Sequence, residues 1–526
     1  MRKSPTRPRR FPGCRGAAII ALVVTAFAAN AAYDYYWYGA AGDGLWTTPA
    51  NWSTTRDSYT KAGDYPRSST FSVHVDTAVA PDHHVTIRIP KLASNPAGCG
   101  AFEFFDSTGA GTLTLAGEPD AETGRPSIPL GNNLKFAWTE TGHPMRLELL
   151  SLNLANGSLS VVENECAGCG VLVSNCVSTT TGNSYYMKLP GQRGGTMTVV
   201  DSEITTQNLN ASSASDVAGY VFAVTNSTIA IKYGADVGGP GTVVDVFGST
   251  LAFGLYAPYF GAGSVATTNE HPGMKIRFKD STLKAGSSGW CHFLSAGGEL
   301  VLDNVTQEGN FKGIGLAGLT TELIDTSLKF YSQNANGYRG ISGTLRLDNS
   351  EWVATNGVCM LNGPLALEFA GRAPAFEASA FSGNYPVTLN FLVPKGGYAR
   401  PPVNRMDNAA TGQVFPSGAA GGAINVLPES PMAQASGTWI VPLIYVKDSK
   451  SSKPVCNLTN LPLTGLPNEK SRFLVTADYE WDYADVNGKA ESDWTPVAVG
   501  YNGNQTAAGV AVKLVGRPPG TVIIVR

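Results

Sequence analysis

One short phrase recurs along the middle of this chain. In KIRFKDSTL, which begins at Lys275, apolar and polar residues alternate, an Asp-Ser pair follows, and an apolar residue then returns. Related phrases are TVVDSEI, FAVTNSTI, DVFGSTL, ELVLDNVT, ELIDTSL and LRLDNSEW, which begin at Thr198, Phe222, Asp245, Glu299, Glu322 and Leu345. Such a repeat constrains the fold strongly, because a unit that cannot bury its apolar face alone must stack on its neighbours.

The period of this repeat lies in the low twenties. Aligned on the residue after the Asp, the steps are 25, 22, 32, 23, 22 and 23 residues, between Ser202, Ser227, Ser249, Ser281, Asn304, Thr326 and Asn349. This is too short for ankyrin or tetratricopeptide units, and the Leu frame of leucine-rich repeats is missing. It fits one coil of a parallel β-helix, in which each coil contributes two or three short strands. We therefore predict an all-β solenoid with coils of about 22–25 residues.

The residues within one phrase fit such a coil. Side chains alternate between the two faces of a strand, so Ile276 and Phe278 are expected to face the core. Arg277 between them is expected to face solvent. The Asp-Ser pair is expected to turn the corner, because these side chains bond nearby backbone and tolerate turn conformations. Leu283 would then open the next strand inward.

The N-terminal residues 1–31 predict an export signal. Six basic residues and no acid precede the apolar run AAIIALVVTAFAA at Ala17, which is too short to span a bilayer as a stable anchor. Small residues follow, and we expect cleavage after Ala31 or Ala32. No second apolar segment is long enough for a membrane. These features predict an extracellular or cell-surface protein with no transmembrane anchor after cleavage.

The remaining chain divides into four predicted regions. Residues 32–95 are expected to form an N-terminal β cap, because an open solenoid end exposes strand edges. Residues 96–395 carry the alternating strands of the β-helix. Residues 396–436 are rich in Pro, Gly, Ala and Asn, which indicates an irregular linker. Residues 437–526 contain longer strands and predict a small β-sandwich-like domain.

Three tryptophans in the cap are candidate ligand-binding residues: Trp37, Trp46 and Trp52. The plainer interpretation is that they form the core of the cap. The functional alternative is that their ring faces stack on sugar rings. Either way, three such large side chains in so short a segment indicate a packed unit, because aromatic residues dominate the energetics of cores and interfaces.

The segment around these tryptophans carries a resemblance to a known family. YYWYGAAGDGLWTTPANWS resembles the W-x-G…G-x-W…x-N-W opening of autotransporter-associated β-repeat proteins of bacteria, through Trp37, Gly39, Gly44, Trp46, Asn51 and Trp52. The repeat itself resembles the right-handed parallel β-helix of pectin-lyase-like proteins and autotransporter passenger domains. These resemblances imply a right-handed coil and an exported, adhesin-like surface protein.

Composition and cysteine content limit the classes of function. The net charge is -3 and only 15% of residues are charged, which argues against a nucleic-acid partner. With 60 Gly and 8 Met, the chain has the composition of a turn-rich β protein. Cys166, Cys169 and Cys176 are candidate thiolate ligands, but no fourth ligand has zinc-like spacing. A local disulfide or buried thiols are the alternatives in an exported chain.

Four aspartates recur before the corner residue: Asp280, Asp303, Asp325 and Asp348. If they occupy one coil position, they stack at about 4.8 Å. Two carboxylates at that distance repel by roughly 1 kcal/mol in water and about 3–4 kcal/mol at an effective dielectric of 20. Backbone N–H groups at each turn could offset this repulsion, or Ca²⁺ could bridge the carboxylates. Paired acids for glycoside hydrolysis are a third alternative.

No catalytic motif stands out elsewhere. The six His are scattered, and G-x-S-x-G, P-loop and H-E-x-x-H motifs are absent. A β-helix lyase would need a basic residue beside acids, and the candidates are Arg277, Lys279, Lys284, Lys329 and Arg346. We predict a non-enzymatic, adhesin-like or structural protein with a glycan or surface partner and no resident cofactor. The alternative is a secreted polysaccharide lyase or glycoside hydrolase on the same scaffold.

Overall fold

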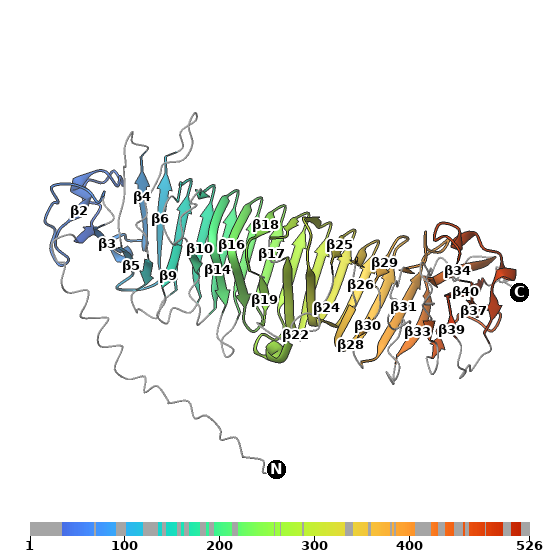
Figure 1. Cartoon of the computed structure of the whole chain (residues 1–526). Helices are drawn as coiled ribbons and strands as arrows, with labels where there is room; N and C mark the ends of the chain where they lie inside the picture. The colour runs from blue at the N-terminus through green and yellow to red at the C-terminus, as the bar shows by residue number, and fades with distance from the viewer. Residues whose placement is uncertain are drawn as a thin grey trace, which may run out of the picture.

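The chain is an elongated all-β solenoid whose coils stack from one end of the molecule to the other (Figure 1). The computed structural model describes residues 34–67, 70–90, 101–118, 135–138, 144–154, 159–162, 168–178, 186–188, 194–212, 219–256, 258–262, 265–286, 289–331, 340–355, 359–378, 381–382, 385–404, 422–429, 437–445, 456–457, 462–478, 480–497 and 506–516. Within these ranges the turns average about 25 residues and the solenoid spans residues 73–403. The predicted export signal lies outside the described residues.

Within the described residues, the coils contribute strands to three parallel ladders, the third of which begins at β11 (Val177–Ser178). The first ladder joins β1 (Asp34–Trp37), β3 (Ser72–Asp76), β5 (Ala101–Phe105), β7 (Lys135–Trp138), β9 (Leu159–Val162), β12 (Tyr186–Lys188), the later parts of β14 (Glu203–Ser212) and β16 (Thr228–Gly238), β19 (Tyr259–Gly261), the earlier parts of β22 (Trp290–Asp303), β24 (Gly313–Ile324), β26 (Ile341–Asp348) and β28 (Cys359–Ala370), and β30 (Phe381–Ser382). Neighbours in this ladder belong to successive coils.

The second ladder precedes the corner that the sequence repeat encodes. It joins β4 (His84–Ile89), β6 (Gly111–Gly117), β8 (Met145–Leu150), β10 (Cys169–Ser174), β13 (Gly195–Val200), β15 (Val221–Thr225), β17 (Val243–Phe247), β20 (Lys275–Lys279), the later parts of β22, β24, β26 and β28, then β31 (Val387–Val393), β33 (Ala423–Pro428) and β36 (Leu463–Thr464).

The third ladder follows the corner and leads into the C-terminal strands. It contains β11 (Val177–Ser178), the earlier parts of β14 and β16, β18 (Thr250–Phe253), β21 (Thr282–Lys284) and β23 (Thr306–Glu308). Along the same face an 8-stranded sheet then runs through β25 (Ser327–Phe330), β27 (Glu351–Ala354), β29 (Ala375–Glu377), β32 (Val403–Asn404), β34 (Thr438–Tyr445), β40 (Gly509–Val515), β37 (Arg472–Thr476) and β38 (Thr495–Pro496). The parallel pairing of β32 with β34 joins the C-terminal strands to this face.

The core of the solenoid consists of the inward side chains predicted from alternation. In β20, Ile276 and Phe278 are buried, while Arg277 is exposed. Leu283 is buried on the following strand. Phe278 meets the ring of Phe260 from the first ladder edge-on at 5.8 Å. Aromatic side chains from two ladders therefore interlock across the interior, which ties the faces of each coil together.

A column of small hydroxyl side chains lines the inner side of the corner. The Ser249 hydroxyl accepts a hydrogen bond from the Ser227 backbone N–H at 3.0 Å and donates to the Phe247 carbonyl at 2.7 Å. The same bridging recurs at neighbouring coils, at Ser202, Ser227, Ser281, Thr326 and Ser350. Each hydroxyl satisfies backbone groups that face the core, where an unpaired donor costs about 1–3 kcal/mol. The repeated Ser or Thr therefore pairs backbone groups of neighbouring coils.

The N-terminal cap covers the exposed edges of the first coil. Strand β1 pairs with the edge strand β3 of the first ladder, and β2 (Trp52–Ser53) pairs with β1 in the antiparallel sense. A bridge between Leu45 and Arg88 covers the edge of β4 in the second ladder. The cap therefore protects two strand edges that would otherwise be free to pair with another chain.

A buried carboxylate fixes the turn between β5 and β6. Asp106 accepts hydrogen bonds from the Thr77 hydroxyl at 2.7 Å, from His83 Nδ1 at 2.7 Å and from the Gly109 backbone N–H at 2.6 Å. Burial by itself raises the pKa of Asp106, but these hydrogen bonds outweigh it and hold the pKa far below its ordinary value. The ionised carboxylate therefore stabilises the folded state.

We expect Asp106→Asn to lower the free energy of unfolding at pH 7 by about 2 kcal/mol, since hydrogen bonds to a charged acceptor are lost. A depressed folded pKa contributes stability above the ordinary carboxyl pKa of about 4 and loses it as pH falls toward the folded value. In urea unfolding, the difference in the free energy of unfolding between wild type and variant should therefore be smaller at pH 3 than at pH 7. An equal gap at both pH values would contradict the assignment.

Candidate functional site

The corner of each coil is turned by one residue in the left-handed backbone conformation. Asp280, Asn304, Asp325 and Asn349 have φ angles of 49°, 53°, 47° and 47°. Asn and Asp tolerate this conformation better than other non-glycine residues. Aspartate and asparagine therefore alternate from coil to coil in this column, called here the corner column.

The prediction that four aspartates share one coil position is wrong. In the second ladder Asp303 is in register with Lys279 and Ile324, and Ile324 is in register with Asp348. Asp303 and Asp348 thus end their strands one residue before the corner. In VLDN the Asp lies one residue before the corner, whereas in LIDT the Asp itself turns the corner. The inward-facing hydroxyl column, and not the first Asp, sets this register.

Side-chain amides offset part of the expected charge repulsion. The Asn304 side-chain amide donates to the Asp280 carboxylate at 2.7 Å, and Asn226 donates to Asp201 in the same way at 3.2 Å. The corner carboxylates of Asp280 and Asp325 therefore lie two coils or roughly 10 Å apart, with Asn304 between them. In the part of the chain that is described, no three His, Cys, Asp or Glu side chains gather as a metal-binding group.

Substitutions at Asn304 test the corner conformation. Asn304→Gly and Asn304→Val both remove the amide that donates to Asp280. Glycine accepts a φ of 53° freely, whereas a β-branched residue is strained there. We expect the valine variant to be less stable than the glycine variant by about 1–3 kcal/mol in urea denaturation. Equal stabilities would show that the corner does not require the left-handed conformation.

The basic residues considered as lyase candidates are mostly engaged in ion pairs between coils. Lys279 lies 3.0 Å from Asp303, and Arg346 lies 3.2 Å from Glu322. Two further pairs join coils, Lys284 with Glu308 at 3.1 Å and Lys329 with Glu351 at 3.6 Å, and Arg346 also lies 3.4 Å from Asp348 on its own strand. Because these cations are engaged by carboxylates, this pattern disfavours them as general bases.

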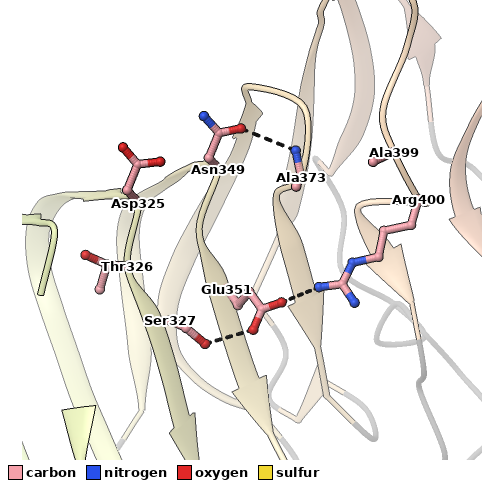
Figure 2. Close-up of a pocket in the computed structure, with 8 residues that line it drawn as sticks. All are labelled: Asp325, Thr326, Ser327, Asn349, Glu351, Ala373, Ala399 and Arg400. Atoms are coloured by element: carbon pink, nitrogen blue, oxygen red, sulfur yellow. Dashed lines mark hydrogen bonds and ion pairs between the residues drawn. The ribbon is translucent and has the colours of Figure 1, made fainter. Parts of the chain in front are cut away.

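Of the four predicted aspartates, Asp325 lies at a pocket. This pocket, of about 450 Å³, opens on the third face and is also lined by Ser327, Asn349, Glu351 and Arg400. Figure 2 shows Ser327 and Arg400 approaching Glu351 from opposite sides, while Asp325 lies at the rim. Ser327 donates to Glu351 Oε2 at 2.8 Å, and Arg400 donates to Oε1.

The electrostatics of Glu351 suit a structural ion pair. Burial raises its pKa, but the Ser327 hydroxyl and the cations of Arg400 and Lys329 outweigh burial and lower the pKa below its ordinary value. Glycoside hydrolysis with a general acid needs a carboxyl group whose pKa is raised. Glu351 has the opposite property. It holds neighbouring coils to the segment that contains Arg400.

The three tryptophans predicted as ligand-binding residues form the core of the cap. Trp46 and Trp52 are fully buried, and Trp37 is 5% exposed. Their rings meet edge-on, with centroids of Trp46 and Trp52 5.0 Å apart and those of Trp37 and Trp52 4.9 Å apart. The Trp52 indole donates to the Trp46 carbonyl at 2.7 Å. Trp46 and Trp52 therefore present no ring face to a sugar, whereas Trp37 also lines a pocket of the cap.

The other motif residues also support the cap. Asn51 is fully buried, and its side chain accepts from the Ala41 backbone N–H at 2.9 Å and donates to the Leu45 carbonyl at 2.9 Å. Gly39 and Gly44 have φ angles of 62° and 67°. The spacing of Trp, Gly and Asn in this segment is therefore explained by packing and turn geometry.

Four cysteines in the described ranges, Cys169, Cys176, Cys291 and Cys359, are disulfide-bonded or buried. Cys169 is part of a disulfide bond. Cys176 is a buried free thiol that donates to the Leu149 carbonyl at 3.3 Å, at the position that Ser202 takes in the next coil. Burial raises the pKa of the free thiols of Cys291 and Cys359. Buried thiols with a raised pKa are inert, so these residues do not provide thiolates. Cys166 lies outside the described residues.

The fold and site define a parallel β-solenoid protein with an N-terminal cap. The chain matches no protein-family model, no curated protein and no solved structure. Across the described ranges, no helix has the length and apolar character needed to cross a membrane.

Proposed function

We propose that this protein is an exported, non-catalytic solenoid that acts as a secreted or cell-surface scaffold and binds an extracellular glycan. The basic N-terminal segment followed by a short apolar run supports export. The resemblance of the repeat to pectin-lyase-like and autotransporter passenger solenoids, and of the cap segment to autotransporter-associated repeats, supports an adhesin-like role at a bacterial surface.

The observation that carries this proposal is the use of polar side chains between coils. At two corners the carboxylate accepts a hydrogen bond from the asparagine of the next coil, Asp280 from Asn304 and Asp201 from Asn226. Lysines such as Lys279 pair with acids of the next coil. An enzyme site instead needs acids and a base that converge on an open cleft with pKa values matched to their roles. Polar groups used in this way stabilise a long surface for binding.

The alternative is a polysaccharide lyase or glycoside hydrolase. The pocket that contains Asp325, Glu351 and Arg400 favours it, because it places two acids and a cation at one opening. Against it, Glu351 is ionised and tied to Arg400 and Ser327. We therefore rank binding above catalysis.

Incubation of the purified protein with acidic and neutral polysaccharides tests the non-catalytic part of this proposal. We expect neither reducing ends nor unsaturated uronate ends to accumulate above a heat-denatured control. Release of either product, abolished by Glu351→Gln but not by Glu308→Gln, would overturn the proposal and assign hydrolysis or elimination to the pocket. Glu308 is a suitable control because it forms a comparable exposed ion pair, with Lys284, outside the pocket.

A further inference from the structure

A second pocket lies in the N-terminal cap, outside the corner column. It has a volume of about 220 Å³ and lies between β1, the loop that carries Arg56 and Asp57, and strands β3 and β5. Its walls include both aromatic and charged side chains, among them Tyr36, Tyr38 and Phe105. Ligand sites combine apolar walls with a few polar groups in this way.

The aromatic rings of this pocket are held in place by their neighbours. Tyr36 stacks on His74 with ring centroids 4.7 Å apart and an interplanar angle of 16°. His74 is in turn held by Glu103, whose Oε2 lies 2.6 Å from Nδ1. Tyr38 packs against Tyr59 at 5.6 Å. The rings are therefore fixed before a ligand arrives, which lowers the entropic cost of binding.

The polar groups of the pocket have bonding capacity left over. The Arg56 guanidinium lies 5.6 Å from the centre of the Phe105 ring, and within the described chain it forms no ion pair. Asp76 uses Oδ1 to accept from the Ala78 and Ser107 backbone N–H groups, at 2.9 and 3.2 Å. Its Oδ2 and the exposed Asp57 carboxylate have no hydrogen-bond partner among the residues described. Donors and acceptors thus stand beside the rings.

We propose that this cap pocket binds a sugar ring at the end of an oligosaccharide. A sugar presents an apolar C–H face, which suits the rings of Tyr36 and Tyr38, and a rim of hydroxyl groups that donate and accept. Arg56 can donate to those hydroxyl groups, and Asp57 and Asp76 can accept from them. An apolar ligand would leave these charges desolvated and unpaired. A simple ion would make no use of the aromatic walls.

The size of the pocket favours one terminal ring. Its volume is below the roughly 300–1,000 Å³ of pockets that hold drug-sized molecules. This inference rests on the proposed glycan-binding function and gives that function a location. It also extends the predicted stacking from Trp37, which lines the same pocket, to Tyr36 and Tyr38, whose side chains alternate outward from Trp37 along the chain.

Binding of the whole protein to an immobilised panel of neutral, acidic and N-acetylated oligosaccharides tests this inference. We expect the wild type to bind at least one, and Tyr36→Ala and Arg56→Ala to weaken the dissociation constant for that glycan by about tenfold or more, as for a binding hot spot. Tyr256→Ala is the matched control, because Tyr256 is 59% exposed and lies outside the pocket. The control should change affinity less than about twofold.

The outcomes separate the two proposals. A glycan bound equally well by wild type and both pocket variants would overturn the cap pocket and leave glycan binding by the protein standing. Absence of binding by the wild type across the panel would overturn both. Arg56 is exposed, so Arg56→Ala is not expected to disturb folding even if Tyr36→Ala does. Unfolding midpoints equal to that of wild type would show that an affinity loss is local.

Discussion

Replacing Phe278 with alanine is expected to lower the free energy of unfolding by about 3–5 kcal/mol. The side chain is fully buried, and its ring meets Phe260 at 5.8 Å and Phe293 at 6.3 Å. Truncation removes apolar contacts and leaves a cavity that stacked coils above and below cannot fill. Urea denaturation followed by circular dichroism measures the loss.

Arg277→Ala on the same strand is the matched control. Arg277 is exposed and points away from the core. Its replacement should change the free energy of unfolding by no more than about 0.5 kcal/mol, as for an ordinary surface site. If Phe278→Ala were as mild as Arg277→Ala, the inward and outward faces of β20 would be wrongly assigned.

Gly261→Ala is expected to be nearly as damaging, at roughly 3–5 kcal/mol, although it adds a single methyl group. Gly261 has a φ of 101°, a conformation that costs an alanine about 1–3 kcal/mol. A Cβ at this position would also lie 2.0 Å from the Leu294 carbonyl oxygen of the adjacent coil. The coils would have to separate locally, which adds the cost of overpacking.

Gly297→Ala separates these two causes. Gly297 has a φ of 65°, but no atom lies within 4 Å of a Cβ built there. Its replacement should therefore cost only the conformational strain of about 1–2 kcal/mol. The difference between the two variants in urea denaturation reports the clash with Leu294. Equal losses of stability in the two variants would show that the close approach of Leu294 to Gly261 does not add to the cost of the substitution.

The alternation of the repeat was sufficient to predict the core. Side chains such as Ile276 and Phe278 face inward because a strand alternates with a period of two, and that period is visible in six residues. The corner residue was also predictable in kind, because Asp and Asn favour turns. Both features depend only on residues that are close together in the sequence.

The coil register could not be obtained from the same pattern. LVLDNV and KIRFKDS each place an Asp near the corner, but Asp303 ends its strand while Asp280 turns the corner. Contacts between coils decide which of two neighbouring residues turns the corner. One such contact is the hydrogen bond from the Val305 backbone N–H to the Thr326 hydroxyl. That contact joins residues that are 21 apart in the sequence, so the pattern within one phrase does not reveal it.

The two pockets were missed for related reasons. Arg400 follows the predicted end of the β-helix at residue 395, yet the third face continues through β32 and brings it against Glu351. In the cap, the predicted residue Trp37 does line the second pocket, but the tyrosines on either side of it, which line the same pocket, carried no separate signal in the sequence. Both pockets depend on segments far apart in sequence that the coil stacking brings together.

One measurement tests the central claim, a scaffold that holds a glycan without cleaving it. A fluorescently end-labelled polysaccharide, chosen as the best-bound member of the glycan panel, is incubated with the intact protein. The bound fraction and the chain length are then read from the same sample by native and denaturing gels. The account predicts a saturable shift of the label at unchanged chain length. Shortened labelled chains, or no shift at saturating protein, would contradict it.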